Sequence, residues 1–146
     1  MRAPFVAVAA LVALAAAARL ARRSLVLVSV IGDSMEPTLF DGDRILVRRR
    51  LPAALRRGDI AVLAGPDLPP VPGLDPPAWQ VKRIVALAGD PAPVDIPMPD
   101  GAVTVPAGTV VVLGDNPAGG DSRQLGPYPA GGLVGTFVCR SWSAPR

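Results

Sequence analysis

The chain has 146 residues, of which 50% are hydrophobic and 18% charged, and its formal net charge is +3. That length leaves room for one domain and a membrane segment but hardly for two domains, and the hydrophobic content argues against disorder of the whole chain. Histidine is absent and Cys139 is the single cysteine. This composition excludes Ser-His-Asp and Cys-His catalysis, histidine-ligated zinc, intramolecular disulfides and CxxC redox chemistry.

Residues 3–18 form an uninterrupted apolar run of sixteen, with one arginine before it and three shortly after it. As a helix the run spans ~24 Å, less than the ~30 Å hydrocarbon core, so the flanking arginines must reach outward to the headgroups if it crosses. We predict one membrane helix within residues 1–23; a cleaved signal peptide and a buried soluble helix are the alternatives. The excess of arginine after the run favours a cytoplasmic location for the rest of the chain.

From residue 24 onward the pattern is one of short β-type runs separated by glycine and proline. We predict strands at residues 24–31, 43–49, 59–63, 79–87, 102–105, 109–113 and 133–141. A turn is expected at 99–101, and a hairpin is expected to join 102–105 to 109–113. Residues 64–78 contain six prolines and are predicted to be an extended loop. No helical periodicity follows the first segment, so residues 24–146 are predicted to form a mainly β domain.

Ser34 follows the first predicted strand, in the sequence GDSMEPTL at 32–39. A glycine before it and Pro37 after it favour a loop that presents the serine rather than packing it in a strand. Ser34 is therefore a candidate nucleophile. The alternative is a turn serine that only hydrogen-bonds to nearby backbone.

Lys82 is the only lysine among fifteen basic residues, the other fourteen being arginine. A lysine can become a neutral amine, whereas a guanidinium effectively cannot. To act as a base near pH 8, its pKa must fall from about 10.4 by two to three units, or ~3 to 4 kcal/mol, through burial or a neighbouring cation. Arg83 cannot supply that cation, because adjacent strand residues face opposite sides. The alternative is an exposed lysine at a strand edge, where it limits aggregation.

The third notable segment is the glycine-rich stretch at 113–127, LGDNPAGGDSRQLGP. In the simplest interpretation it is a plain loop that contains an ion pair between Asp121 and Arg123. It lacks the glycine-lysine-serine ending of a phosphate-binding loop, and no helix is predicted to follow, so nucleotide binding is not expected.

Together the three segments resemble the type I signal peptidases, membrane-anchored Ser/Lys endopeptidases that include the inner-membrane peptidases of mitochondria. SMEPTL at 34–39 is similar to the nucleophile motif of that family, KR at 82–83 with GD at 89–90 to its lysine motif, and GDN…DSR…GP at 114–127 to its third motif. The motifs occur in the family's order, after one N-terminal apolar segment. The resemblance therefore covers nearly the whole chain.

The resemblance implies that Ser34 attacks the scissile carbonyl and that Lys82 removes its proton and later protonates the leaving amine. It also implies that the backbone N–H of Ser34 holds the oxyanion. No metal and no cofactor are expected. Structural roles near the site are implied for Met35, Pro37, Arg83, Gly114, Asp115, Asn116, Asp121, Ser122 and Arg123. Arg83 is expected to pair with Asp115, and Asp121 with Arg123.

For the whole protein, the resemblance implies an N-terminal single transmembrane helix (residues 1–23) followed by a compact all-β signal-peptidase-like catalytic domain (residues 24–146). It places the chain in the cell membrane, single-pass, with the catalytic domain on the extracytoplasmic side, against the arginine count. The implied partners are signal or leader peptides of exported proteins, with small side chains near the cut, and the lipid bilayer. Nucleic acid is not an expected partner.

Gly119 departs from the family pattern, because many members carry a serine there that orients the lysine, in a loop one residue longer. Two alternatives stay open: a dedicated maturation peptidase for one substrate, of the nickel superoxide dismutase type, and a catalytically silent relative that binds leader peptides. A repressor-type self-cleaving regulator would need a DNA-binding helical region. A nucleic-acid module, suggested by a pI near 10 and the arginines at 48–50, lacks a recognition motif.

Overall fold

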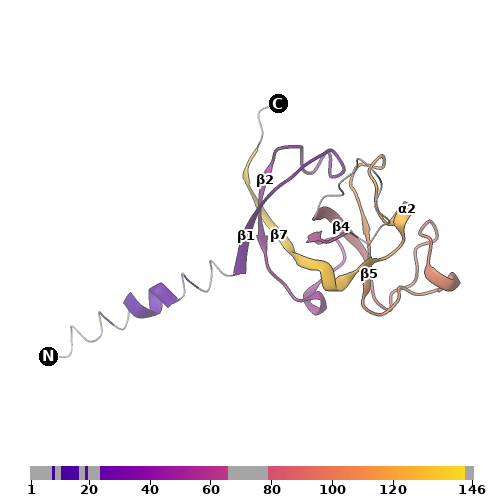
Figure 1. Ribbon diagram of the computed structural model, residues 1–146, viewed down its shortest axis with the longest axis horizontal. Helices are drawn as coiled ribbons and strands as arrows, with labels where there is room; N and C mark the ends of the chain where they lie inside the picture. The colour runs from indigo at the N-terminus through magenta and orange to yellow at the C-terminus, as the bar shows by residue number, and fades with distance from the viewer. Residues whose placement is uncertain (1–7, 9–10, 17–18, 20–23, 66–78, 144–146) are drawn as a thin grey trace, which may run out of the picture.

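The computed structural model describes residues 8, 11–16, 19, 24–65 and 79–143. In the described part, seven strands form one sheet in the order β1-β2-β7-β3-β4-β5-β6, with neighbouring strands antiparallel (Figure 1). The strands are β1 (Leu25–Ser29), β2 (Arg44–Arg48), β3 (Ile60–Leu63), β4 (Gln80–Leu87), β5 (Thr109–Leu113), β6 (Tyr128–Pro129) and β7 (Leu133–Trp142). Helical turns occur in α2 (Ser122–Leu125) and in 3-10 segments at Pro52–Ala54, Pro99–Gly101 and Ala130–Gly132. The prediction of a mainly β fold is confirmed.

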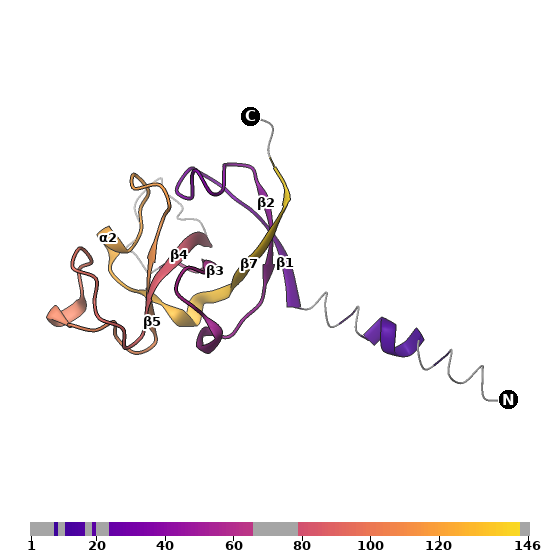
Figure 2. The same cartoon turned by 180° about the vertical axis from the view of Figure 1, so that it is seen from behind.

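β7 joins the two halves of the curled sheet, because it pairs with β3 near its start and with β2 along the rest of its length (Figures 1 and 2). Gly135 lies where the strand passes from one partner to the other. A Cβ atom at Gly135 would be 2.2 Å from the carbonyl oxygen of Arg48 and 2.9 Å from a methyl group of Val47. Only glycine allows the two backbones to approach this closely.

β3 lies in the middle of the sheet and all four of its residues are buried. Ile60 and Val62 pack into a core cluster with residues of β1, β2 and the loop between them, whereas Ala61 and Leu63 pack into a second cluster with β4, β5 and β6. This alternation follows from the period of two in a strand. Both faces of β3 are therefore covered, and the two clusters hold the two halves together.

The prediction of a strand at 102–105, and of a hairpin from it to β5, is wrong. Its backbone bonds instead to residues 89–92, with Val105 donating to the carbonyl of Asp90 and Ala92 to that of Val103. Both edges of β5 are already occupied, by β4 and β6. The side chain of Val105 is buried in a third cluster that also contains Val111 of β5. The apolar character of the segment therefore reflects this packing and not a ladder with β5. The other six predicted strands are confirmed, with ends that differ by a few residues.

α2 and β6 were not predicted. α2 begins with a capping box in which the Asp121 carboxylate accepts from the N–H of Arg123 and the Gln124 side chain accepts from the N–H of Asp121. The spacing of aspartate and glutamine three residues apart is a readable signal for such a start. Four residues are too few to show helical periodicity, so the hydrophobic pattern does not reveal it.

Two predicted segments lie largely or wholly outside the described residues. Within 1–23, only residues 8, 11–16 and 19 are described, and these are helical and exposed. Among the residues that the structure describes, no helix has the length and apolar character needed to cross a bilayer. The membrane helix within 1–23 stays a prediction, as does the loop character of residues 66–78.

Candidate active site

Ser34 lies on the loop between β1 and β2, and its neighbours on that loop anchor it to the core. Met35 and Leu39 are each 1% exposed and belong to the cluster that includes β1, β2 and β3. The backbone between them makes a turn in which Leu39 donates to the carbonyl of Met35, and the peptide bond before Pro37 is cis. Ser34 itself is half-buried. Its position at the edge of the core is thus set by the apolar residues that follow it.

β7 holds the other end of this loop through charged contacts. Asp43 is 1% exposed and forms an ion pair with Arg140 of β7 at 3.1 Å. Arg140 also donates to the carbonyl of Thr38. The loop that carries Ser34 is therefore tied to the strand that joins the two halves of the sheet.

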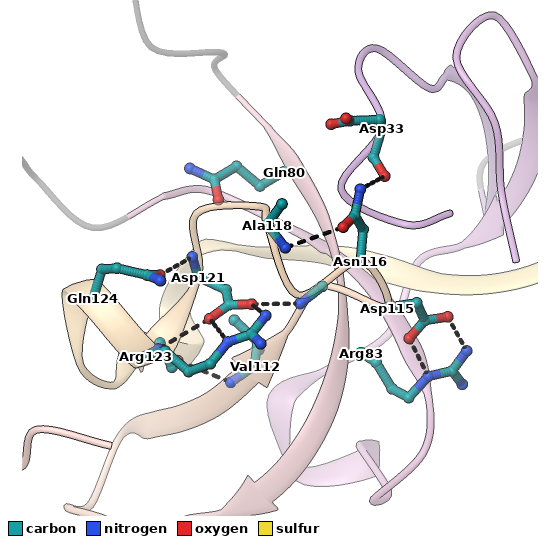
Figure 3. A network of polar contacts seen from close by, with 12 residues as sticks. Asp33, Gln80, Arg83, Val112, Asp115, Asn116, Ala118, Asp121, Arg123 and Gln124 are labelled. Carbon is teal, nitrogen blue, oxygen red and sulfur yellow. Dashed lines mark hydrogen bonds and ion pairs between the residues drawn. The ribbon is translucent and has the colours of Figure 1, made fainter. Parts of the chain in front are cut away.

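Asn116 of the third motif contacts the backbone on both sides of the Asp33–Ser34 peptide bond. Its N–H donates to the carbonyl of Ser34 at 3.0 Å. Its side-chain Nδ2 donates to the carbonyl of Asp33 at 3.2 Å (Figure 3). The Asn116 Oδ1 accepts from the N–H of Ala118, which tightens the third-motif loop. These bonds fix the main chain of the candidate nucleophile.

Asp115 connects all three motifs. It receives two hydrogen bonds from Arg83, at 2.8 Å and 2.6 Å, and one from the hydroxyl of Thr38. The bonds from Arg83, followed by that from Thr38 and the charge of Arg83, lower the pKa of Asp115 in spite of its partial burial. The ion pair expected between Arg83 and Asp115 is present and joins β4 to the third motif, and the bond from Thr38 connects both to the loop of Ser34.

The Asp121 side chain is fully buried and lies at the start of α2. Burial by itself would raise its pKa, but the hydrogen bonds from the side chain and N–H of Arg123 and from the N–H of Gly114 outweigh that effect, so the pKa is lowered. The expected ion pair with Arg123 is present (Figure 3). Ser122 is also buried, and its hydroxyl accepts from the N–H of Val112.

Lys82 is 4% exposed and lies on β4, between β3 and β5. The alternative interpretation, an exposed lysine at a strand edge, is therefore wrong. Burial lowers the pKa of Lys82, and the charge of Arg123 lowers it further, whereas Asp121 and Asp33 oppose the shift. The neighbouring cation comes from α2, not from Arg83, as the opposite orientation of adjacent strand residues requires.

A buried tyrosine that the sequence did not single out supports the same region. Tyr128 is 0% exposed and donates its hydroxyl proton to Gln80 Oε1 at 3.0 Å. Burial, together with the charge of Asp121, raises the pKa of Tyr128 to about 12, so it stays a neutral donor. Gln80 lies two residues before Lys82 on β4 and so faces the same side of the sheet, which strand alternation alone could have indicated.

Ser34 and Lys82 line one cavity of about 710 Å³. Three segments form its walls, residues 28–31, 34–35 and 79–82, and Gly120 completes it. Most of the lining side chains are apolar, so a hydroxyl and a buried amine of lowered pKa share a largely apolar space. This combination suits acyl transfer by a nucleophilic serine with an amine base.

The described part of the chain was also searched for side chains that could bind a metal ion. Among the described residues, no group of three or more aspartate, glutamate or cysteine side chains is placed to hold an ion.

Comparison with known proteins gives consistent matches. A family model described as "Signal peptidase, peptidase S26" matches residues 3–95. The chain is 33% identical over 120 residues to the mitochondrial inner membrane protease subunit 1 of Schizosaccharomyces pombe, covering 79% of this chain and 72% of that protein. It is 34% identical over 119 residues to the mitochondrial ATP-independent inner membrane protease subunit 1b of Arabidopsis thaliana, covering 76% and 66%. It is 34% identical over 138 residues to the probable signal peptidase I-1 of Synechocystis, covering 78% and 69%.

The lowered pKa values of Asp115 and Asp121 predict how stability depends on pH. A carboxylate whose pKa is lower in the folded state contributes stability above its unfolded pKa of about 3.9, and this stability is lost as the pH falls through the folded pKa. We expect the free energy of unfolding, measured by urea denaturation at each pH, to decrease steadily below about pH 4. Asp121→Asn should be less stable at pH 7 and should show a shallower decrease, with the exposed Asp95→Asn as the control for loss of one charge. An unchanged slope in Asp121→Asn would contradict this account.

Proposed function

The chain belongs to the signal peptidase family, peptidase S26, and is a serine endopeptidase that removes signal or leader peptides; we propose that Ser34 is its nucleophile and Lys82 its general base. The observation that carries the proposal is their common cavity, in which Lys82 is buried and its pKa is lowered. The comparisons do not favour the two alternatives, a peptidase dedicated to one substrate and a silent leader-binding relative.

The reaction begins when the neutral amine of Lys82 accepts the proton of the Ser34 hydroxyl, as Oγ attacks the scissile carbonyl. The tetrahedral intermediate places its negative charge near the backbone N–H of Ser34, which Asn116 helps to orient by holding the carbonyls of residues 33 and 34. The protonated Lys82 then gives its proton to the leaving amine. Water, activated by the same amine, hydrolyses the acyl-enzyme and restores both groups.

The substrate cleft is the cavity between β1 and the start of β4. β1 is an edge strand of the described sheet, so an extended leader peptide can lie along it by main-chain hydrogen bonds. Valine, isoleucine and methionine side chains from residues 28–31 and 35 form much of the wall. Such a wall favours small apolar side chains next to the cut over charged ones.

We further propose that residues 1–23 are the membrane anchor and residues 24–146 the catalytic domain, in a single-pass protein of the cell membrane whose catalytic domain is extracytoplasmic. Relatives named as inner membrane proteases support a membrane location. Ile31 is 85% exposed and Trp79 is 47% exposed, and both line the cavity. Exposed apolar side chains there suit contact with the lipid bilayer.

Substitution of the two proposed catalytic residues should abolish cleavage of a leader peptide. Ser34→Ala and Lys82→Ala are each expected to lower kcat by about 10⁴-fold or more, as the loss of members of other serine catalytic sites does. Lys82→Arg should be equally inactive, because arginine cannot release its proton to become a base. Cleavage of a fluorogenic leader peptide by the purified variants measures this. A Lys82→Arg enzyme with near-normal turnover would refute the base assignment.

The rate of cleavage should rise with pH, because only the deprotonated Lys82 is the base. Since the pKa of Lys82 is lowered, the acid limb of the kcat profile should have its midpoint below the ordinary lysine value of about 10.4. Arg123→Gln removes a positive charge and frees the Asp121 carboxylate, and both effects favour protonated Lys82, so the limb should move to higher pH. Arg57→Gln, which breaks the exposed pair with Asp90, is the control. If the midpoint of the acid limb in Arg123→Gln is unchanged or lies at lower pH, the proposed influence of Arg123 and Asp121 on Lys82 is wrong.

The proposed topology can be tested in a bacterial host. The full chain should stay in the membrane pellet after alkaline carbonate extraction, and a tag at the C-terminus should be digested by protease added to intact spheroplasts. A chain that lacks residues 1–23 should move to the soluble fraction. Protection of the tag in intact spheroplasts, together with its digestion after lysis, would show the opposite orientation.

A further inference from the structure

Gly119 lies directly against the side chain of Ser34. A Cβ atom at Gly119 would be 2.8 Å from Ser34 Cβ and 3.2 Å from Ser34 Cα, whereas ordinary contacts begin at 3.4 Å. The N–H of Gly119 donates to the carbonyl of Asn116, and the N–H of Asn116 donates to the carbonyl of Ser34. The loop at 116–119 is thus bonded to the same backbone against which Gly119 packs.

Neither side of this contact is free to move away. Ser34 is followed by the buried Met35, and its carbonyl is held by Asn116. At the start of the third-motif loop, a Cβ at Gly114 would be 2.4 Å from the carbonyl oxygen of Ser34, so that end also touches the serine backbone. At the other end, Asp121 is buried and bound to Gly114 and Arg123. The loop at 114–121 is therefore fixed at both ends, and Gly119 within it is in close contact with Ser34.

We propose that Gly119 is a positioning residue, whose missing side chain allows the third-motif loop to hold Ser34 in place at the cavity shared with Lys82. The inference rests on the proposed role of Ser34 as the nucleophile. It assigns the position a steric function: the backbone of residue 119 restricts Ser34, and no hydroxyl at 119 is needed. A serine at this position, expected to orient the lysine in many signal peptidases, would place its Cβ within 2.8 Å of Ser34 Cβ.

The kinetic test compares Gly119→Ala and Gly119→Ser with the parent enzyme. Either new side chain must displace Ser34 or the loop by roughly half an ångström or more to restore an ordinary contact. Because misplacement of a reacting group by about 1 Å can reduce the rate about 100-fold, we expect kcat to fall by about 10- to 100-fold in both variants, with KM unchanged. Gly131→Ala is the control, since nothing lies within 4 Å of a Cβ there, and it should match the parent.

The two variants also separate the steric role from a polar one. If position 119 acts by excluding a side chain, Gly119→Ser is no better than Gly119→Ala. A Gly119→Ser enzyme as active as the parent, or more active, would overturn the proposal, as would an unchanged kcat in Gly119→Ala. Ser34→Ala, measured in parallel, keeps the two hypotheses apart. Full activity in Ser34→Ala refutes the proposed function, whereas an inactive Ser34→Ala with a fully active Gly119→Ala refutes only the role of Gly119.

A stability cycle tests the contact without reference to activity. Gly119→Ala should lower the Tm of the parent, but should lower it much less in a Ser34→Gly background, because the clashing Cβ is then absent and only the 3.2 Å approach to Cα remains. If Gly119→Ala alone does not fold, the double variant should recover folding. An equal loss of Tm in both backgrounds, or a double variant that also fails to fold while Ser34→Gly folds, would show that Gly119 does not act on Ser34.

Discussion

The burial of Lys82 in the sheet is the constraint on which the site depends. An ammonium ion loses much of its hydration at this position on β4, which is flanked by β3 and β5, so burial favours the neutral form. Two carboxylates nearby, Asp121 and Asp33, would favour the charged form. Their influence is limited because Asp121 is already bound to Arg123 and to backbone N–H groups, and because Arg123 itself repels the ammonium. The ion pair between Asp121 and Arg123 therefore stabilises the start of α2 and also limits how far Asp121 can raise the pKa of Lys82.

The two proposed catalytic groups come from opposite halves of the sheet. Ser34 lies on the loop that packs with β1 and β2, and Lys82 lies on β4 in the other half. Two features keep the halves in register: β7, which pairs with both, and Asp115, which bonds to Arg83 beside the lysine and to Thr38 in the serine loop. A change in either feature would alter the distance between the halves and, with it, the geometry of the cavity. In this molecule the site is thus a property of the whole sheet.

Main-chain atoms make most of the close contacts between the third motif and the proposed nucleophile. The N–H of Asn116 donates to the carbonyl of Ser34, and Gly114 and Gly119 approach Ser34 so closely that no Cβ fits. Main-chain atoms are held by their own hydrogen bonds and have no rotamers to choose from, so they restrict a neighbour more tightly than a flexible side chain does.

The amino-acid sequence alone determined the local features. Six strands followed from alternation and from glycine and proline punctuation. Ser34 became a candidate through its loop context and Lys82 through being the only lysine, and the two ion pairs were implied by the resemblance to the signal peptidases. The sequence could not determine partners. The segment at 102–105 has the pattern of a strand, yet it makes only an isolated bridge and backbone hydrogen bonds with residues 89–92. The cation beside Lys82, the bond from Tyr128 to Gln80 and the contact of Gly119 with Ser34 join residues 41 to 85 positions apart. A residue pattern specifies which face a side chain occupies, but only the packed sheet decides what lies opposite that face, because burial and close approach arise from the assembled chain.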